Sequence, residues 1–296
     1  MNRFEFGILV ASLRNDLHWT QKTLSEKSGV DISVISNIER GERRTLLKDN
    51  IHMKLAQGFR LTSLESLEFM LAASSVAEDE KLRTKRGHPK DKFDAAAFLK
   101  EAGGQIARIK LPVFITDSFC DALLANRCAR NFHNIPPVMI QSAGATIGGY
   151  NLMRFIFDAN SGFPAVIHND DLERKALVNV RYFRRRTLRV RHKPYFARLL
   201  NELLDNKKYP SFERCWRKVL FEEFDDLSLP IETVREDDAN SFLSIDTLYA
   251  ATPFGELYMH TLLPLNQKTS DLMEGLSKSS GEGYELFAAF PDERKS

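Results

Sequence analysis

The chain has 296 residues, of which 43% are hydrophobic and 28% charged, and its formal net charge is +2. This composition excludes a disordered chain, and the length favours two domains over one. A net charge so close to zero gives no strongly basic field over the whole molecule, so any surface that binds nucleic acid must be a local one.

The cysteines and the hydropathy pattern point to a soluble protein of a reducing compartment. The three cysteines, Cys120, Cys128 and Cys215, include no CxxC pair, which argues against a disulfide framework and a zinc knuckle. No stretch approaches the roughly 18 apolar residues of a membrane span, and the apolar run at the N-terminus contains Glu5 and is too short for a signal peptide. We therefore expect a cytoplasmic protein.

Apolar residues recur at intervals of three and four between residues 4 and 73, which predicts several short helices. A charged stretch without this periodicity follows over residues 77–92 and is interpreted as a linker, and a short helix is expected over 93–101. These boundaries place a helical domain at 1–76 and a linker with a connecting helix at 77–104. The periodic apolar positions are Phe6, Leu9, Val10, Leu13, Leu17, Leu47, Ile51, Leu55, Leu64, Leu67 and Leu71.

The second half mixes strand and helix patterns. A strand is expected over 111–115, and helices over 172–183 and 195–204. Residues 243–249 and 257–263 alternate between apolar and polar on either side of a turn, which predicts a β-hairpin. The fold class is therefore two-domain: an all-α domain, then an α+β domain with an antiparallel sheet over 105–270, then a flexible tail over 271–296.

The strongest local signal lies between Leu13 and Arg44. Thr20 can cap one helix, Gly29 can take the positive φ of a tight turn, and Asp31 can cap the next helix. Val30, Ile35 and Ile38 then anchor that second helix on a core, and Gly41 ends it. Such a pair of helices is a helix-turn-helix, whose second helix enters the major groove of DNA.

The exposed side of that second helix carries the candidate base-reading residues, because short polar side chains suit the edges of bases in a major groove. Gln21 and the arginines beyond the helix are candidates for phosphate contacts that fix the register. The base-reading candidates are Ile32, Ser33, Ser36 and Asn37, of which Asn37 suits either role, and the phosphate-binding candidates are Gln21, Arg40, Arg43 and Arg44.

The ordered set Leu13-Arg14, Thr20-Gln21, Gly29-Val30 and Ile38-Glu39-Arg40-Gly41 resembles the XRE or Cro-like helix-turn-helix family. The resemblance covers about residues 3–74 and implies a five-helix, lambda-repressor-like DNA-binding domain. A helical bundle used for protein contacts is the alternative. The basic linker residues Lys85, Arg86, Lys90 and Lys92 are either solvated or an arm for the minor groove.

The second domain shows no catalytic constellation and no metal-ligand spacing. Its histidines are scattered without an HExxH companion, and neither GxSxG nor a P-loop occurs. The loop at residues 144–149 is glycine-rich but lacks the spacing of a nucleotide cradle. The sequence therefore predicts neither an enzyme nor a resident cofactor.

Three segments within residues 105–265 resemble the MmyB-like ligand-binding domain: Pro112–Asp117 with Ala122–Asn126, Asn151–Phe157, and the strands around Gly255–Leu257. The resemblance implies a PAS-like fold behind an XRE module and a bound fatty acid or related lipid. Physically, such a ligand needs a long apolar cavity with a few polar groups. The candidate ligand-binding residues are Phe114, Leu123, Asn126, Met153, Arg154, Phe157 and Arg181.

Two groups of charged residues keep more than one interpretation. Arg154 can hold a carboxylate bidentately or form a surface salt bridge. The basic run from Arg181 to Lys193 can be a solvated helix end, a site for an anionic headgroup or an additional DNA contact.

Together these patterns predict a ligand-responsive repressor or activator of bacterial type, located on the nucleoid when bound to DNA. The usual symmetry of operators implies a homodimer on double-stranded DNA, with two heads about 34 Å apart. An antitoxin-like regulator whose second domain binds a protein is the alternative. An enzyme with a DNA-targeting head is a third reading, for which no clustered residues are found.

Overall fold

A computed structural model describes residues 1–42, 50–82, 94–158, 169–209, 211–221, 231–236 and 238–296. The chain divides into two compact units. Unit 1 comprises Met1–His88, Arg184–Ala197 and Arg217–Leu227, and unit 2 comprises Pro89–Phe183, Arg198–Trp216 and Ser228–Ser296. In the described part of the chain, no helix is long and apolar enough to cross a membrane.

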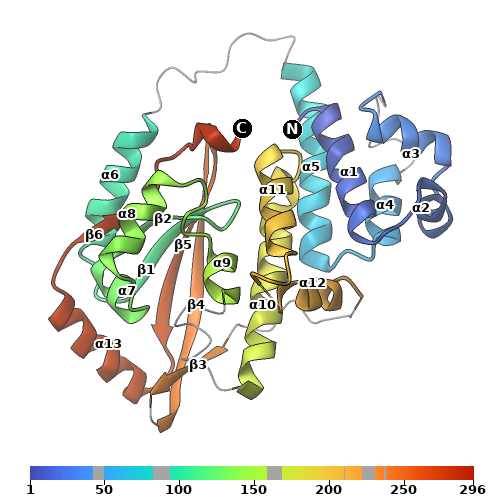
Figure 1. The fold of residues 1–296 in the computed structure, drawn as a ribbon. Coiled ribbons are helices and arrows are strands. Elements are labelled where there is room, and N and C mark those ends of the chain that lie inside the picture. The colour runs from blue at the N-terminus through green and yellow to red at the C-terminus, as the bar shows by residue number, and fades with distance from the viewer. Residues whose placement is uncertain (43–49, 83–93, 159–168, 210, 222–230, 237) are drawn as a thin grey trace. The chain divides into compact units, whose positions relative to one another are not determined.

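Unit 1 contains the five helices α1 to α5 (Figure 1). Their boundaries follow the capping rules, as the sequence predicted: Thr20 caps α2, Gly29 has a φ of 66° directly after it, and Asp31 caps α3. A capping box between Asn2 and Glu5 starts α1. The bounds are Arg3–Asp16 (α1), Gln21–Ser28 (α2), Ile32–Glu39 (α3), Ile51–Gly58 (α4) and Ser63–Leu82 (α5).

The core of this helical domain is built from apolar side chains on all five helices. Ile35 and Ile38 of α3 are fully buried, and Val30 is nearly so, which confirms their predicted role as anchors of this helix. Phe6 of α1 contacts Phe69 of α5, with 5.2 Å between the ring centroids. This packing buries one side of α3, which holds the helix in place, and leaves its other side exposed.

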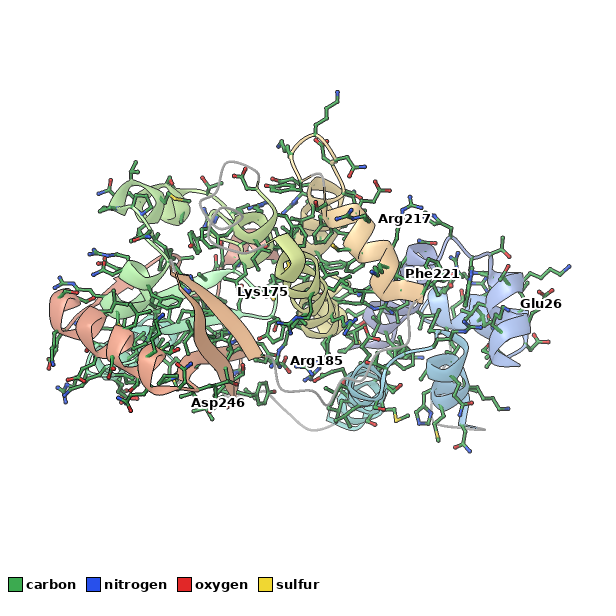
Figure 2. All side chains as sticks on the ribbon, turned by 90° about the horizontal axis from the view of Figure 1, so that it is seen from below. Glu26, Lys175, Arg185, Arg217, Phe221 and Asp246 are labelled. Atoms are coloured by element: carbon green, nitrogen blue, oxygen red, sulfur yellow. The ribbon has the colours of Figure 1, made fainter. Side chains whose placement is uncertain are left out.

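A later segment of the chain, Arg184–Ala197, also belongs to unit 1. It comprises the end of α10 (Asn169–Thr187), a short 3-10 helix (Leu188–Val190) and the start of α11 (Pro194–Leu203). Helix α10 thus supplies residues to both units: Lys175 precedes the boundary and Arg185 follows it (Figure 2). Helix α12, Phe212–Phe221, is likewise shared.

Two arginines of this segment form buried ion pairs with the first helices of the chain. Arg184 lies 2.6 Å from Glu65 of α5, and their side chains are only 4% and 6% exposed. Arg191 pairs with Asp16 of α1 and lies over the ring of Phe196. The interpretation of the basic run as a solvated helix end is therefore wrong for Arg184 and Arg191, because each is buried in an ion pair with a carboxylate.

Unit 2 is built on an antiparallel sheet with the strand order β3-β4-β5-β1-β2-β6. The predicted hairpin is confirmed: β4 pairs with β5 from Leu243 and Pro264 to the turn at Thr252 and Gly255. Strand β1 pairs with β2 and with β5, so β1 lies at the centre of the sheet. The strands are Val113–Asp117 (β1), Ala122–Asn126 (β2), Ile231–Glu236 (β3), Asp238–Thr252 (β4), Gly255–Pro264 (β5) and Tyr284–Leu286 (β6).

Helices α6, α7, α8 and α13 contact this sheet, and α9 follows the loop after α8 (Figure 1). Leu99 and Ile106 of α6 pack with Val113, Ile115 and Leu124 of the central strands. The result is an α+β domain with an antiparallel sheet, as predicted. The helices are Ala95–Ile106 (α6), Arg127–Phe132 (α7), Pro137–Ala145 (α8), Leu152–Phe157 (α9) and Gln267–Ser280 (α13).

The expected flexible tail over 271–296 is folded. Most of α13 lies in this range, β6 pairs with β2, and Phe287 is buried. The penultimate residue, Lys295, is only 5% exposed and lies 2.5 Å from a carboxylate oxygen of both Asp117 and Asp121. A composition rich in Ser, Gly, Glu and Lys suggested disorder, but a strand partner and a buried ion-pair network supply the order that composition does not reveal.

Candidate DNA-binding surface and ligand pocket

The exposed side of α3 presents the predicted base-reading residues. Ile32 and Ser33 are exposed, and Ser36 and Asn37 are half-buried. The carboxylate of Asp31 accepts hydrogen bonds from the backbone N–H of Ser33 at 2.7 Å and from its hydroxyl at 2.5 Å. The bond from the Ser33 hydroxyl lowers the pKa of Asp31, so this cap is ionised at neutral pH. Helix α3 therefore carries short side chains of the kind that suits a major groove.

An ion-pair network holds α1, α2 and α3 together behind this surface. Arg14 of α1 donates to both carboxylate oxygens of Glu39 in α3, at 2.7 and 3.0 Å, and to the backbone oxygen of Trp19. Gln21 of α2 donates to Glu39 at 2.8 Å. The network explains why Leu13-Arg14, Thr20-Gln21 and Ile38-Glu39 occur together: their polar members meet at one carboxylate. Glu39, which the sequence reading did not propose as a site residue, positions the recognition helix.

The candidates for phosphate contacts are distributed differently. Arg40 is exposed directly after α3, where it donates to Asn37 at 2.6 Å and to Ser36 at 3.1 Å, and lies 3.0 Å from Glu42. Gln21 is bound to Glu39, as above. Arg43 and Arg44 lie outside the described residues, as do the linker residues Lys85, Arg86, Lys90 and Lys92. The structure thus brings Arg40 beside two of the base-reading candidates.

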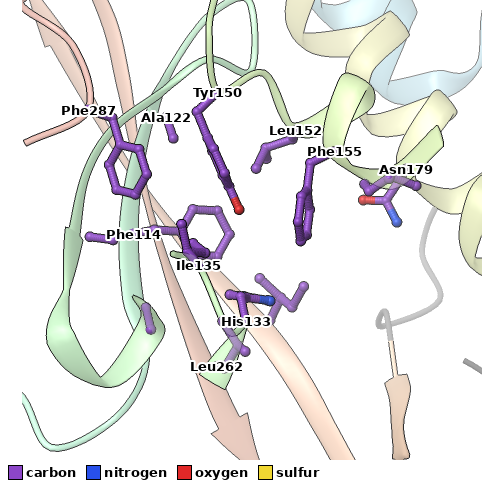
Figure 3. Close-up of a pocket in the computed structure, with 14 residues that line it drawn as sticks. Phe114, Ala122, His133, Ile135, Tyr150, Leu152, Phe155, Asn179, Leu262 and Phe287 are labelled. Carbon is purple, nitrogen blue, oxygen red and sulfur yellow. The ribbon is translucent and has the colours of Figure 1, made fainter. Parts of the chain in front are cut away.

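In unit 2, an apolar pocket of about 80 Å³ lies between the sheet and the segments that cover it (Figure 3). Its wall is rich in aromatic rings: Tyr150 lies 4.9 Å from Phe287 and 5.4 Å from Phe155, measured between ring centroids. His133 lies 6.2 Å from Phe114 and 6.3 Å from Phe155. The lining residues are Phe114, Ala122, Ala125, Ala129, His133, Ile135, Tyr150, Leu152, Phe155, Ile156, Asn179, Ile245, Leu262 and Phe287.

Three of these lining residues are polar: His133, Tyr150 and Asn179. Removal from water lowers the pKa of His133 to about 4, so the imidazole is neutral at pH 7. Desolvation also raises the pKa of Tyr150 above its usual value, so its hydroxyl keeps its proton. The pocket is therefore a hydrophobic site with a few neutral hydrogen-bonding groups.

Of the seven predicted ligand-binding residues, Phe114 lines this pocket and the other six lie elsewhere. The Asn126 side chain accepts from the backbone N–H groups of Val113 and Ala129 and donates to the backbone oxygen of Leu111, so it fixes the start of α7. Arg154 pairs with Glu202 at 2.6 Å and donates to the backbone oxygen of Ile147. Both polar side chains are therefore bound to other groups of the protein itself.

The remaining predicted residues are part of the core or lie near it. Met153 is fully buried, and Phe157 packs edge-on against Phe212 with 5.2 Å between ring centroids. Leu123 belongs to the cluster beneath α6. Arg181 is half-buried on α10. The polar lining residues came from separate segments, and no short motif connects His133, Tyr150 and Asn179, so sequence spacing carried no signal for them.

Comparison with known families agrees with both parts of this description. Residues 10–62 match the helix-turn-helix family model, and residues 106–276 match the model of the MmyB-like transcription regulator ligand binding domain. A search of curated proteins found no match to the chain. The second match covers more than half of the chain. The chain therefore carries a helix-turn-helix and belongs to the family of the MmyB-like transcription regulator ligand binding domain.

Proposed function

We propose that the protein is a transcription regulator in which residues 1–76 read an operator sequence and residues 105–270, of PAS-like fold, bind a small hydrophobic ligand that changes DNA affinity. The observation that carries this proposal is the combination, in one chain, of an exposed α3 and an aromatic-walled pocket. No catalytic step is part of the proposal. A fatty acid or related lipid is the ligand class that the sequence resemblance implied.

The exposed surface of α3 supports the DNA-binding part. Ser33 is exposed at the start of the helix, where side chains of a recognition helix reach base edges. Arg40, beyond the other end, is an exposed cation suited to a phosphate. We assign base reading to Ile32, Ser33, Ser36 and Asn37 and backbone positioning to Arg40, Arg43 and Arg44.

We also propose that the regulator is a cytoplasmic homodimer, and an apolar surface on α5 supports the dimer. Leu67 and Leu71 are half-exposed and lie one turn apart on this helix. Exposed leucines at this spacing form a stripe that a second copy can cover. A dimer places two recognition helices on successive major grooves, which gives the affinity that one short helix does not supply.

Two substitutions test the division between base reading and positioning. We expect Ser33→Ala to reduce the preference for the best operator over a scrambled one by about fivefold to tenfold, because it removes a group proposed to face a base. We expect Arg40→Ala to weaken binding to both sequences alike and to lower the salt dependence of binding by about one unit of slope.

The measurement is fluorescence anisotropy on operators selected from random DNA, with the full chain at several salt concentrations. Glu26→Ala is the control, because Glu26 is an exposed residue of α2 that is not among the residues assigned to DNA binding (Figure 2). An equal loss on every sequence from both test variants would refute the assigned roles. Absence of DNA binding by the wild-type chain would refute the proposal itself.

A further inference from the structure

The polar groups of the aromatic-walled pocket carry no charge. Among the fourteen described residues that line it, none is Lys, Arg, Asp or Glu, and these residues are apolar apart from His133, Tyr150 and Asn179. A carboxylate moved from water into such a site loses its hydration, and no described lining residue supplies a compensating cation. The chemistry of the wall therefore disfavours an ionised headgroup inside the pocket.

Tyr150 offers an unused hydrogen bond at this site. Its side chain is only 7% exposed, and its hydroxyl points into the space between the rings of the pocket (Figure 3). None of the residues described by the structure hydrogen-bonds to this hydroxyl, whereas Tyr209, equally buried, donates to Glu202 at 3.3 Å. Because this hydroxyl faces the pocket, a ligand or a water molecule there can form its hydrogen bond.

Asn179 and His133 are two further uncharged groups of the pocket that can form hydrogen bonds. The Asn179 amide nitrogen donates to the backbone oxygen of Lys175 at 2.9 Å, and within the described residues no donor reaches the amide oxygen. That oxygen is an acceptor at the edge of the pocket (Figure 3). His133, neutral because desolvation lowers its pKa to about 4, has one donor and one acceptor nitrogen. The three groups therefore offer hydrogen-bond donors and acceptors to a ligand at different places in the pocket lining.

The size of the pocket limits the apolar part of its occupant. Its volume of about 80 Å³ is well below the roughly 300–1,000 Å³ typical of sites for drug-sized ligands. Such a space suits a small apolar group, and the surrounding rings favour contact with a flat or flexible one.

We propose that this pocket binds a small uncharged hydrophobic molecule, of the alcohol, phenol or carbonyl class, whose polar group hydrogen-bonds to the Tyr150 hydroxyl. The inference rests on the proposed function and narrows its ligand class: within the lipid-related molecules, a short alcohol or carbonyl compound is preferred over an ionised fatty acid.

Matched pairs of probes test the charge preference. Calorimetric titration of the full chain at pH 7.5 compares 1-hexanol with hexanoate and benzyl alcohol with benzoate, because each pair shares its apolar part and differs in the charge of its polar group. We expect each alcohol to bind at least tenfold more tightly than its acid. Equal or tighter binding of either acid overturns the inference.

Tyr150→Phe tests the hydrogen bond without removing the ring. In this variant we expect the preference for benzyl alcohol over toluene to fall about fivefold while toluene binds as it does to the wild type. Tyr209→Phe is the matched control, because it removes an equally buried hydroxyl outside the pocket lining. An unchanged preference in Tyr150→Phe, or an equal loss in Tyr209→Phe, contradicts the role of Tyr150.

The outcomes separate this inference from the proposed function. If the acids bind as well as the alcohols and also change DNA affinity, the sensor remains and only the ligand class is wrong. If none of the probes binds, both the ligand class and the pocket as a sensing site are refuted, while DNA binding by unit 1 is judged separately by the operator experiment.

Discussion

Replacing Arg184 with methionine is expected to lower the free energy of unfolding by about 3–5 kcal/mol, the largest loss that we predict for unit 1. The side chain of Glu65, 2.6 Å from Arg184, is 6% exposed, so the substitution leaves a buried carboxylate without this cation. Glu65 also accepts a hydrogen bond from the backbone of Thr62 at the start of α5, so its displacement disturbs the beginning of that helix. Urea unfolding of the full chain measures the loss.

Two further variants separate the loss of the ion pair from a general effect of the substitution. The double variant Arg184→Met with Glu65→Leu removes both charges, and we expect it to recover at least half of the lost stability. Lys278→Met breaks the exposed pair with Glu274, whose side chains are 73% and 62% exposed, and is expected to cost less than about 1 kcal/mol. A loss below about 1 kcal/mol in Arg184→Met would show that the segment 184–197 does not stabilise the helical domain.

The second large effect is expected at the C-terminus, where Lys295→Met should cost about 3–5 kcal/mol at pH 8. Lys295 lies 2.5 Å from both Asp117 and Asp121, and all three side chains are buried. Although burial disfavours the ammonium, the two carboxylates raise the pKa of Lys295 above its ordinary value. Without this cation, two buried carboxylates face each other, and one of them must take up a proton or leave the interior.

This variant is also expected to depend on pH in a direction opposite to ordinary acid denaturation. Burial raises the pKa of Asp117, and loss of Lys295 removes a charge that lowers it. A folded-state pKa above the unfolded value of about 4 stabilises the fold at low pH, and this contribution is lost as the pH rises through the folded-state value. Lys295→Met should therefore lose less stability, relative to the wild type, at pH 5 than at pH 8.

Unfolding curves at the two pH values, with Lys278→Met as the exposed control, decide the matter. A difference between Lys295→Met and the wild type that is the same at pH 5 and pH 8 would contradict the account of two carboxylates neutralised by one lysine.

The features predicted correctly from the sequence are those set by neighbouring residues. The caps Thr20 and Asp31 and the positive φ of Gly29 follow from local rules, and the structure confirms all three. The hairpin around Thr252 and Gly255 was recognised by alternation and a turn, which are also local. In such cases the residues that determine the local structure lie within a few positions of the residues they affect.

Features that depend on distant partners were not predictable in the same way. Lys295 is ordered by carboxylates almost 180 residues earlier in the chain, and its own neighbours suggest a tail. Helix α5 shows the same difficulty: Leu67 and Leu71 fit a buried stripe by spacing, but they are half-exposed, and Phe69, Ala72 and Ala73 are buried instead. A helix that is apolar on several sides does not reveal which side faces the core.

The sequence predicted the apolar character of the pocket, but most of the residues that line it were not predicted. The sequence predicts an apolar cavity with a few polar groups, and Asn126 and Arg154 are the polar candidates beside Arg181. The structure pairs both with backbone and side-chain groups of unit 2. The polar groups left for a ligand, on His133, Tyr150 and Asn179, come together only through the tertiary fold.

The central claim is that one chain couples a ligand in the pocket to DNA binding by α3, and a linkage measurement tests it most directly. The affinity of the full chain for its selected operator is measured with and without saturating 1-hexanol, and the affinity for 1-hexanol with and without operator. The account predicts that the two affinities change by the same factor, about fivefold or more, because coupling between two sites is reciprocal. Operator affinity that is identical with and without bound 1-hexanol would contradict it.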